Sequence, residues 1–310
     1  MLRRWILGIG LTVACLGLAR AFPGPEKVWE LRQRTPNFET KVGRALVSVA
    51  AKNPGLAPGL ARHLLEDLGD EPLQALMDAH ADLKARYPDF DKQLAAMLEQ
   101  GRQGRQQVRK RYPRLRTWFL GRLQALPEQP PRPLAYVSQH HSGLMLSLAL
   151  SASRLVDEKY PDLPNRWSER KGHQGLASFM LENYPDFFSQ FVRSLSDEQR
   201  REVRQAALGY LKEREDWARR QPPGRLQEGY DDLLSQFPGI AESWGETRAS
   251  IFKARLEKFP EMRQVVLESL GSKHPQLIEK ARQSVDKHYP ELRIQVREAF
   301  RRELGSDIPD

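Results

Sequence analysis

Apolar residues recur along most of this chain at the three- and four-residue spacing of amphipathic helices. Behind Pro36, for example, this spacing places four apolar residues on one helix face: Phe38, Val42, Ala45 and Val49. No stretch shows the alternating, β-branched pattern of a strand bounded by turn signals. We therefore predict an all-α protein, built as an irregular array of short amphipathic helices.

A four-residue phrase recurs where these helices are expected to begin: an aromatic residue, proline, an acid and a large apolar residue. It occurs at 87–90, 160–163, 184–187, 259–262 and 289–292. Proline fits the first helical position, which needs no amide donor, and the acid faces the positive end of the helix dipole. The phrase predicts Pro-initiated helices in which the aromatic residue folds back as a staple.

The C-terminal third contains a 15-residue helical repeat with three consecutive units: Lys258–Ser272, Lys273–Lys287 and His288–Arg302. Their apolar positions coincide, and each unit carries a proline near its start. Gly271 and Ser272 offer a helix stop, whereas no such signal precedes Tyr289. We therefore predict a clean break near residue 272 and a kink or tight corner near residue 289.

Proline-rich stretches divide the chain into blocks. We expect a secretory signal at 1–21, an N-terminal helical block at 22–126, a Pro-rich connector at 127–133, a middle helical block at 134–221, a Pro-Gly break at 222–224 and a C-terminal repeat block at 225–310. The most apolar segment of the middle block is Leu144–Leu150. This segment lies within Gly143–Val156, whose 14 residues are too few to cross a bilayer, so Gly143–Val156 is expected to form a fully buried helix.

The first residues have the three-part plan of a secretory signal peptide. Arg3 and Arg4 precede an apolar run, and Ala19-Arg20-Ala21 is a small-x-small cleavage site. We expect cleavage after Ala21 and a periplasmic or secreted protein, with retention as a membrane anchor as the alternative. Cys15, the only cysteine, lies in this segment, where lipid anchoring is not expected. The mature chain would therefore have no disulfide or thiolate chemistry.

The formal net charge of +9 is concentrated in one run that has no acid between Glu99 and Glu128. Its cations and one aromatic residue are the candidate binding residues: Arg102, Arg105, Arg109, Lys110, Arg111, Arg114, Arg116, Arg122 and Trp118. Arginine interleaved with aromatic residues can bind anionic lipid, an envelope polymer, an acidic protein or nucleic acid. Export makes nucleic acid the least expected of these partners. A solvated basic helix face is the alternative.

No sequence motif assigns catalysis. Adjacent His140 and His141 would point about 100° apart on a helix and so would not chelate one metal together. The chain has no Gly-x-Ser-x-Gly motif and no glycine-rich phosphate loop. We assign no catalytic residue, metal ligand or cofactor, and keep a metal-dependent enzyme around His140 and His141 as an alternative.

Two resemblances bear on function. Residues Leu195–Arg200 resemble the Leu-Thr-x-x-Gln motif of the periplasmic Spy/CpxP stress chaperones, with Ser196 in place of threonine. The same residues form a capping box, in which Ser196 pairs with Gln199. Proline-punctuated amphipathic helices are similar to those of exchangeable apolipoproteins, which lie on lipid. These resemblances imply a periplasmic chaperone or a binder of anionic lipid as an alternative to our main hypothesis, an exported non-enzymatic binding or scaffold protein that contacts a partner protein, an assembly or the envelope surface.

Overall fold

The computed structural model describes residues 25–169, 175–222 and 224–305, so the expected signal at 1–21 and Cys15 lie outside the described residues. The described residues form seventeen α-helices and no strand, which confirms the all-α prediction. The helices are α2 (Pro25–Arg34), α3 (Phe38–Lys52), α4 (Leu56–Leu68), α5 (Glu71–Arg86), α6 (Phe90–Arg111), α7 (Leu115–Gln124), α8 (Pro133–His140), α9 (Ser142–Lys159), α10 (Leu163–Glu169), α11 (Leu176–Asn183), α12 (Phe187–Ser194), α13 (Asp197–Arg219), α14 (Arg225–Gln236), α15 (Ile240–Lys258), α16 (Met262–Lys273), α17 (Leu277–His288) and α18 (Leu292–Leu304).

The first and last thirds of the chain run alongside each other as two rows of helices, which together we call the ribbon. Helix α18 packs on α3, α17 on α4, α16 on α5 and α15 on α6. Helix α7 completes the series by contacting α14 through a shared apolar cluster. Helices early in the first row pair with helices late in the second row, so the two rows of the ribbon are antiparallel.

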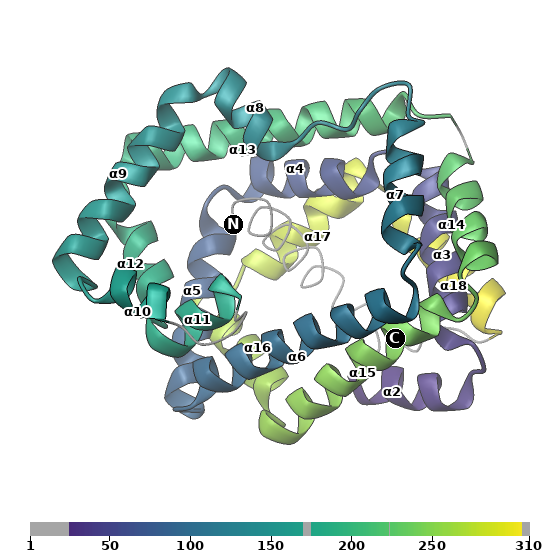
Figure 1. Cartoon of the computed structure of the whole chain (residues 1–310), viewed down its shortest axis with the longest axis horizontal. Coiled ribbons are helices and arrows are strands. Elements are labelled where there is room, and N and C mark those ends of the chain that lie inside the picture. Colours follow the sequence, from purple (N-terminus) through teal and green to yellow (C-terminus); the bar gives the residue numbers. More distant parts are fainter. Residues whose placement is uncertain (1–24, 170–174, 223, 306–310) are drawn as a thin grey trace.

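The ribbon closes on itself. Helices α14 and α15, which lie at the far end of the ribbon, also pack against α3 at its beginning. In Figure 1 α4 and α13 lie above the centre of the view, α9 lies on one side, α6 and α15 lie below, and α7 and α14 lie on the other side. The middle helices pack on the ribbon, since α13 packs along α4 and α11 packs on α6.

The largest apolar core lies between the two rows of helices in the ribbon. Leu64 and Leu68 of α4 and Val285 of α17 belong to one buried cluster, and all are less than a tenth exposed. The small side chains at the crossings let the helices come close. A Cβ atom on Gly104 of α6 would lie 2.2 Å from Thr247 of α15, so this close packing requires glycine.

The aromatic–proline phrase forms the corner between two successive helices. Tyr87 ends α5 by donating its backbone N–H to the Leu83 carbonyl (2.7 Å), and Phe90 begins α6. Because the residue before proline avoids the helical region, Tyr87 has φ −129° and ψ 89°. Each helix therefore follows its proline, but Pro88 occupies the corner rather than the first helical position, and Asp89 at the N-cap makes no capping bond with its side chain.

Corners from the two rows of helices pack against each other. The ring centroids of Tyr87 and Phe259 lie 5.1 Å apart, and the Glu261 N–H donates to the Tyr87 hydroxyl at 3.1 Å. Tyr112 meets Phe237 in the same way at the next pair of corners, with 6.1 Å between centroids. These aromatic residues therefore reach across the ribbon, and each also belongs to the apolar cluster that contains the first residue of its own helix, Phe90 or Leu115.

The helices of the C-terminal third begin at Met262, Leu277 and Leu292. Both expected interruptions are present, and both are corners of the same kind: α16 ends at Lys273 and α17 at His288. At His288 the missing stop signal is replaced by the proline in the corner itself, which cannot donate the next helical hydrogen bond.

Two further expectations for the middle of the chain have opposite outcomes. The predicted capping box is confirmed, since Ser196 Oγ accepts from the Gln199 N–H at 3.1 Å and Gln199 accepts from the Ser196 N–H. The expectation that Gly143–Val156 forms a fully buried helix is wrong: of this segment only Leu144 and Leu155 are buried. No helix in the described parts of the chain combines the length and apolarity that a membrane span requires.

Candidate interaction surfaces and a buried polar network

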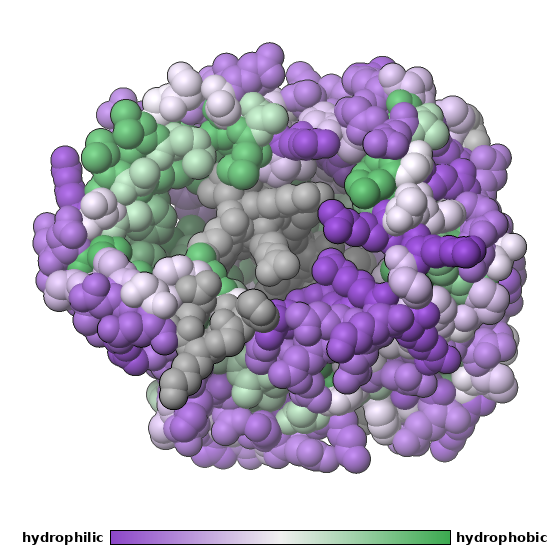
Figure 2. Space-filling view, viewed as in Figure 1, coloured by the Kyte–Doolittle hydropathy of each residue, from purple (hydrophilic) through white to green (hydrophobic). Residues whose placement is uncertain are grey.

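The basic run lies on the C-terminal half of α6, the following corner and α7. Gly101, Gly104 and Val108 bury one face of α6, while Arg105 and Arg109, four residues apart, lie exposed together. Figure 2 shows hydrophilic side chains gathered over this part of α6. The periodicity of α6 therefore places its cations on the surface.

Some of the candidate residues have partners within the fold. Arg102 pairs with Glu99 on its own helix, and Arg122 pairs with Asp232 of α14 at 2.8 Å. Arg111 donates to Ser243 Oγ at 3.1 Å. These three cations contribute to packing as well as to the surface charge.

The other five cations are exposed and form no ion pair within the described residues: Arg105, Arg109, Lys110, Arg114 and Arg116. Trp118 is half-buried against Phe237, with ring centroids 5.9 Å apart, and its Nε1–H donates to Asp232 at 2.9 Å. The structure thus places Trp118 between α7 and α14, while Phe119 and Leu120 beside it are 55% and 45% exposed.

A second surface lies on α8 and α9 and is apolar. Its large side chains are strongly exposed: Leu134 61%, Met145 41%, Leu146 65% and Leu150 51%. Figure 2 shows this hydrophobic patch over α9 and α8. Helix α9 buries Leu144 against Val137 of α8 and Ala206 of α13, and Leu155 farther along packs in a separate cluster. Among the described residues, no helix covers the face of α9 that carries Met145, Leu146 and Leu150, and the predicted burial of this segment therefore fails.

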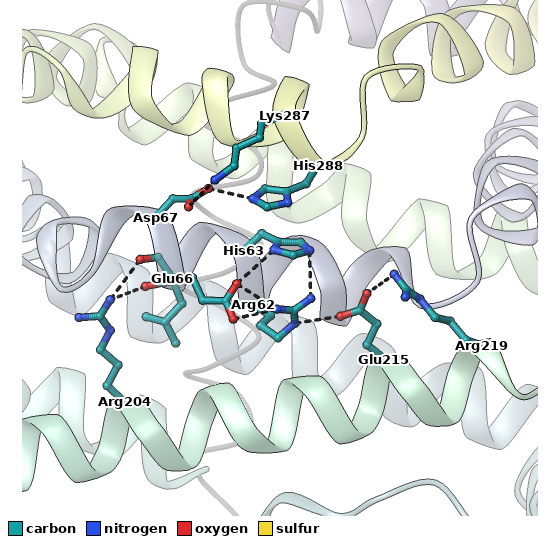
Figure 3. Close-up of polar contacts among 10 residues, drawn as sticks. Arg62, His63, Glu66, Asp67, Arg204, Glu215, Arg219, Lys287 and His288 are labelled. Atoms are coloured by element: carbon teal, nitrogen blue, oxygen red, sulfur yellow. Dashed lines mark hydrogen bonds and ion pairs between the residues drawn. The ribbon is translucent and has the colours of Figure 1, made fainter.

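A polar network joins α4 to α13 on one side and to α17 on the other (Figure 3). Glu215 of α13, only 2% exposed, accepts from Arg62 Nε at 2.9 Å and from Arg219. Arg62 also pairs with Glu66 at 2.7 Å. Burial, followed by the Glu215 charge, raises the pKa of neighbouring Tyr289 to about 12. Two guanidinium groups offset the cost of burying the Glu215 carboxylate.

His63 links this network to α17. Arg62 Nη2 lies 3.0 Å from His63 Nε2, and Glu66 Oε2 lies 3.1 Å from His63 Nδ1. Because a guanidinium group only donates, Nε2 accepts and Nδ1 carries the proton, which is the neutral imidazole. Burial, and then the positive charges of Arg62 and His288, lower the pKa of His63.

Asp67 connects α4 with the end of α17. It lies 3.3 Å from Lys287 Nζ and 3.1 Å from His288 Nε2. Burial alone would raise the pKa of Asp67, but polar contacts from α17, among them those of Lys287 and His288, hold it below its ordinary value. Each carboxylate of this network is therefore engaged by a cation or an imidazole, an arrangement that stabilises helix packing.

His140 and His141 lie apart from this network. His140 is the last residue of α8, where its Nδ1 lies 3.0 Å from the Tyr136 carbonyl and its ring stacks on the Tyr136 ring. His141 joins α8 to α9 and lies 3.9 Å from Glu202. The structure therefore surrounds this pair with one carboxylate and an aromatic ring. Across the described ranges, no group of three His, Cys, Asp or Glu residues is placed to hold a metal ion.

Comparison of the chain with models of known protein families, with curated proteins and with solved structures finds no match. The functional assignment therefore rests on the chemistry of the two surfaces. Sequence reasoning found the cations of α6 and α7 but missed the exposed face of α9. It counted Phe119 among the aromatic residues interleaved with these cations but missed Leu120, whose spacing of four residues from Arg116 was the available signal.

Proposed function

We propose that this chain is an exported, non-enzymatic binding protein that holds a partner protein through the apolar face of α8 and α9. The observation that supports this proposal is the exposure of Leu134, Met145, Leu146 and Leu150 on one side of the molecule. Contiguous apolar surface of this kind is typical of protein contacts, since leaving it in water costs about 25 cal/mol for each Å².

The electrostatic character of this face favours a protein segment over an anionic surface. From Pro133 to Ser153 the chain contains no Asp, Glu, Lys or Arg. An uncharged apolar face gains most by burying apolar side chains of a partner. Met145 adds a flexible side chain that adapts to different shapes.

Hydroxyl groups border the apolar face and suit a polypeptide. Ser147 and Ser151 line a shallow open groove between α9 and α13, and both accept from Gln199 Nε2, at 2.6 and 2.9 Å. Such groups can form hydrogen bonds with the backbone of a segment lying along α9. This is the edge of the proposed contact, whose centre is Leu146 and Leu150.

The experiment first captures the partner and then measures its affinity. A photo-crosslinking amino acid at Leu146 is expected to capture a protein that the same group at Lys253, on α15, does not capture. The captured partner is then purified and titrated against two double variants. L146S/L150S is expected to weaken binding at least about tenfold, the usual effect of losing central apolar contacts.

L226S/I294S is the matched control, because Leu226 and Ile294 are 56% and 60% exposed but lie on α14 and α18. It is expected to bind like the unaltered chain, and circular dichroism checks that both variants keep their helices. Equal affinity of L146S/L150S and the unaltered chain, or a partner captured equally from both positions, would overturn the proposal. Location is tested separately by N-terminal sequencing of protein from the cell envelope, where a start at Phe22 is expected.

A further inference from the structure

The surface formed by the end of α6, the corner and α7 concentrates unbalanced positive charge. Five of its cations are exposed without an ion pair in the described structure: Arg105, Arg109, Lys110, Arg114 and Arg116. The sequence from 100 to 127 contains no acid that could offset them. Asp232, the acid of α14 that reaches α7, is already engaged by Trp118 and Arg122.

Apolar side chains lie on the same face of α7 as one of these cations. Phe119 and Leu120 follow Arg116 by three and four residues, which places all three on one side of the helix. Phe119 is 55% exposed and Leu120 is 45% exposed. Helix α7 packs on α14 through Leu115 and Trp118, so Phe119 and Leu120 do not contribute to that core.

The corner between α6 and α7 is fixed by contacts with the other row of helices in the ribbon. The Tyr112 hydroxyl donates to the Pro238 carbonyl at 3.0 Å, and Arg111 donates to Ser243 Oγ. The guanidinium of Arg111 also lies 5.7 Å from the centre of the Tyr112 ring. The cations and the apolar pair are thus held in a constant arrangement.

We infer that this surface docks on an anionic lipid membrane, with Phe119 and Leu120 entering the boundary between headgroups and acyl chains. Cations at a helix edge are attracted to anionic headgroups, and apolar side chains beside them gain by leaving water. A soluble polyanion would use the cations alone and would leave Phe119 and Leu120 exposed. The apolar pair is therefore the observation that favours lipid.

The test is flotation of the purified chain with vesicles of phosphatidylglycerol and phosphatidylcholine, compared with phosphatidylcholine alone. The chain is expected to float only with the anionic vesicles, and less at high salt, because salt screens the attraction. R109Q/R116Q and F119S/L120S are each expected to weaken binding at least about tenfold. K92Q/R263Q is the matched control for charge, since Lys92 and Arg263 are exposed cations on α6 and α16, away from this surface.

Insertion is measured with an environment-sensitive fluorophore. In a chain with Cys15→Ser, Phe119→Cys provides a single attachment site, and the dye is expected to shift to the blue on anionic vesicles. The same dye at Ile294→Cys, on α18, is expected to stay unshifted. Flotation without a shift at position 119, together with heparin binding that F119S/L120S leaves intact, would show a polyanion site and overturn the lipid inference.

Equal flotation of R109Q/R116Q and the unaltered chain would also overturn this inference. The protein-binding proposal has a separate readout, because L146S/L150S changes α9 and is expected to float like the unaltered chain. Failure of either idea therefore leaves the other to its own measurement.

Discussion

The imidazole rings of His63 and His288 lie face to face, with centroids 3.6 Å apart and planes 9° from parallel. One ring comes from α4 and the other from the last residue of α17, so the stack joins the two rows of helices in the ribbon. Arg62 donates to the ring of His63, which requires that ring to be neutral at the acceptor nitrogen. We therefore expect the pairing of α4 with α17 to be sensitive to acid.

We predict that His63 makes the folded chain less stable as the pH falls below the ordinary imidazole pKa of 6.5. The pKa of His63 is lowered in the folded state, so the unfolded chain binds the proton more readily, and stability present above 6.5 is lost as the pH decreases. Urea unfolding at about pH 7.5 and about pH 5.5 measures this loss, which is expected to be smaller in His63→Gln.

The charged and polar groups around His63 are Arg62, Glu66 and Asp67 from α4, and Lys287, His288 and Tyr289 from α17 and its corner. Glu215 and Arg219 of α13 lie on the far side of Arg62. Because the unaltered chain and His63→Gln share all of these groups, the difference between them measures His63 together with its contact to His288. The same loss of stability in both chains would contradict the prediction.

We predict that Glu215→Ala lowers the free energy of unfolding by about 3 kcal/mol. This change leaves Arg62 without a partner for its Nε, and removing one member of a buried pair costs about 3–5 kcal/mol. The lower end applies because Arg219 is 58% exposed and can be solvated. Chemical denaturation measures the effect.

Glu128→Ala is the matched control for Glu215→Ala. Glu128 pairs with Arg220, and both side chains are about half exposed. Water replaces such a contact readily, so the free energy of unfolding is expected to stay nearly unchanged. Equal effects of the two substitutions would show that the burial of Glu215 contributes nothing.

We predict that Ser196→Ala costs about 1 kcal/mol, because Ser196 Oγ accepts from the Gln199 N–H at the start of α13. Asp89→Ala is the control at the start of α6, where Asp89 occupies the N-cap without a side-chain bond. Its effect is expected to stay below about 0.5 kcal/mol, the size of a dipole contribution at an exposed helix end. The reverse order of the two losses, measured by thermal unfolding, would contradict this.

We predict that Phe259→Ala destabilises the chain by about 3–5 kcal/mol, since it empties the space between two corners. Phe259 is 4% exposed and lies 5.1 Å from the Tyr87 ring and 5.0 Å from the Phe90 ring. Leu226→Ala, at an exposed position, is expected to cost less than about 0.5 kcal/mol. A small loss in Phe259→Ala would show that the corners do not depend on their contact.

The helices could be predicted from sequence because their signals are local. Proline removes a donor wherever it stands, so the ends of α5 and α17 follow from Pro88 and Pro290 alone. The pairing of the corners could not be predicted in the same way. Tyr87 meets Phe259 across more than half of the chain, and no local pattern states which corner faces which.

The candidate site shows the same division. The exposure of Arg105 and Arg109 follows from helical spacing, whereas the partners of Arg111, Arg122 and Trp118 come from distant α14 and α15. The exposure of α9 was missed for a related reason. A continuous apolar run indicates a buried helix only if another element covers it, and coverage is a property of the whole fold.

The antiparallel ribbon has a consequence for how the chain is made and moved. Helix α3 can meet α18 only after the whole sequence between them has been synthesised, and α4 can meet α17 only after the sequence between these two helices. Contacts between such distant segments form slowly, because the long loop between them must close first. A chain that leaves a ribosome or a translocon N-terminus first therefore stays incomplete until its final helix emerges, and during that interval the apolar face of α4 is open to any chaperone within reach.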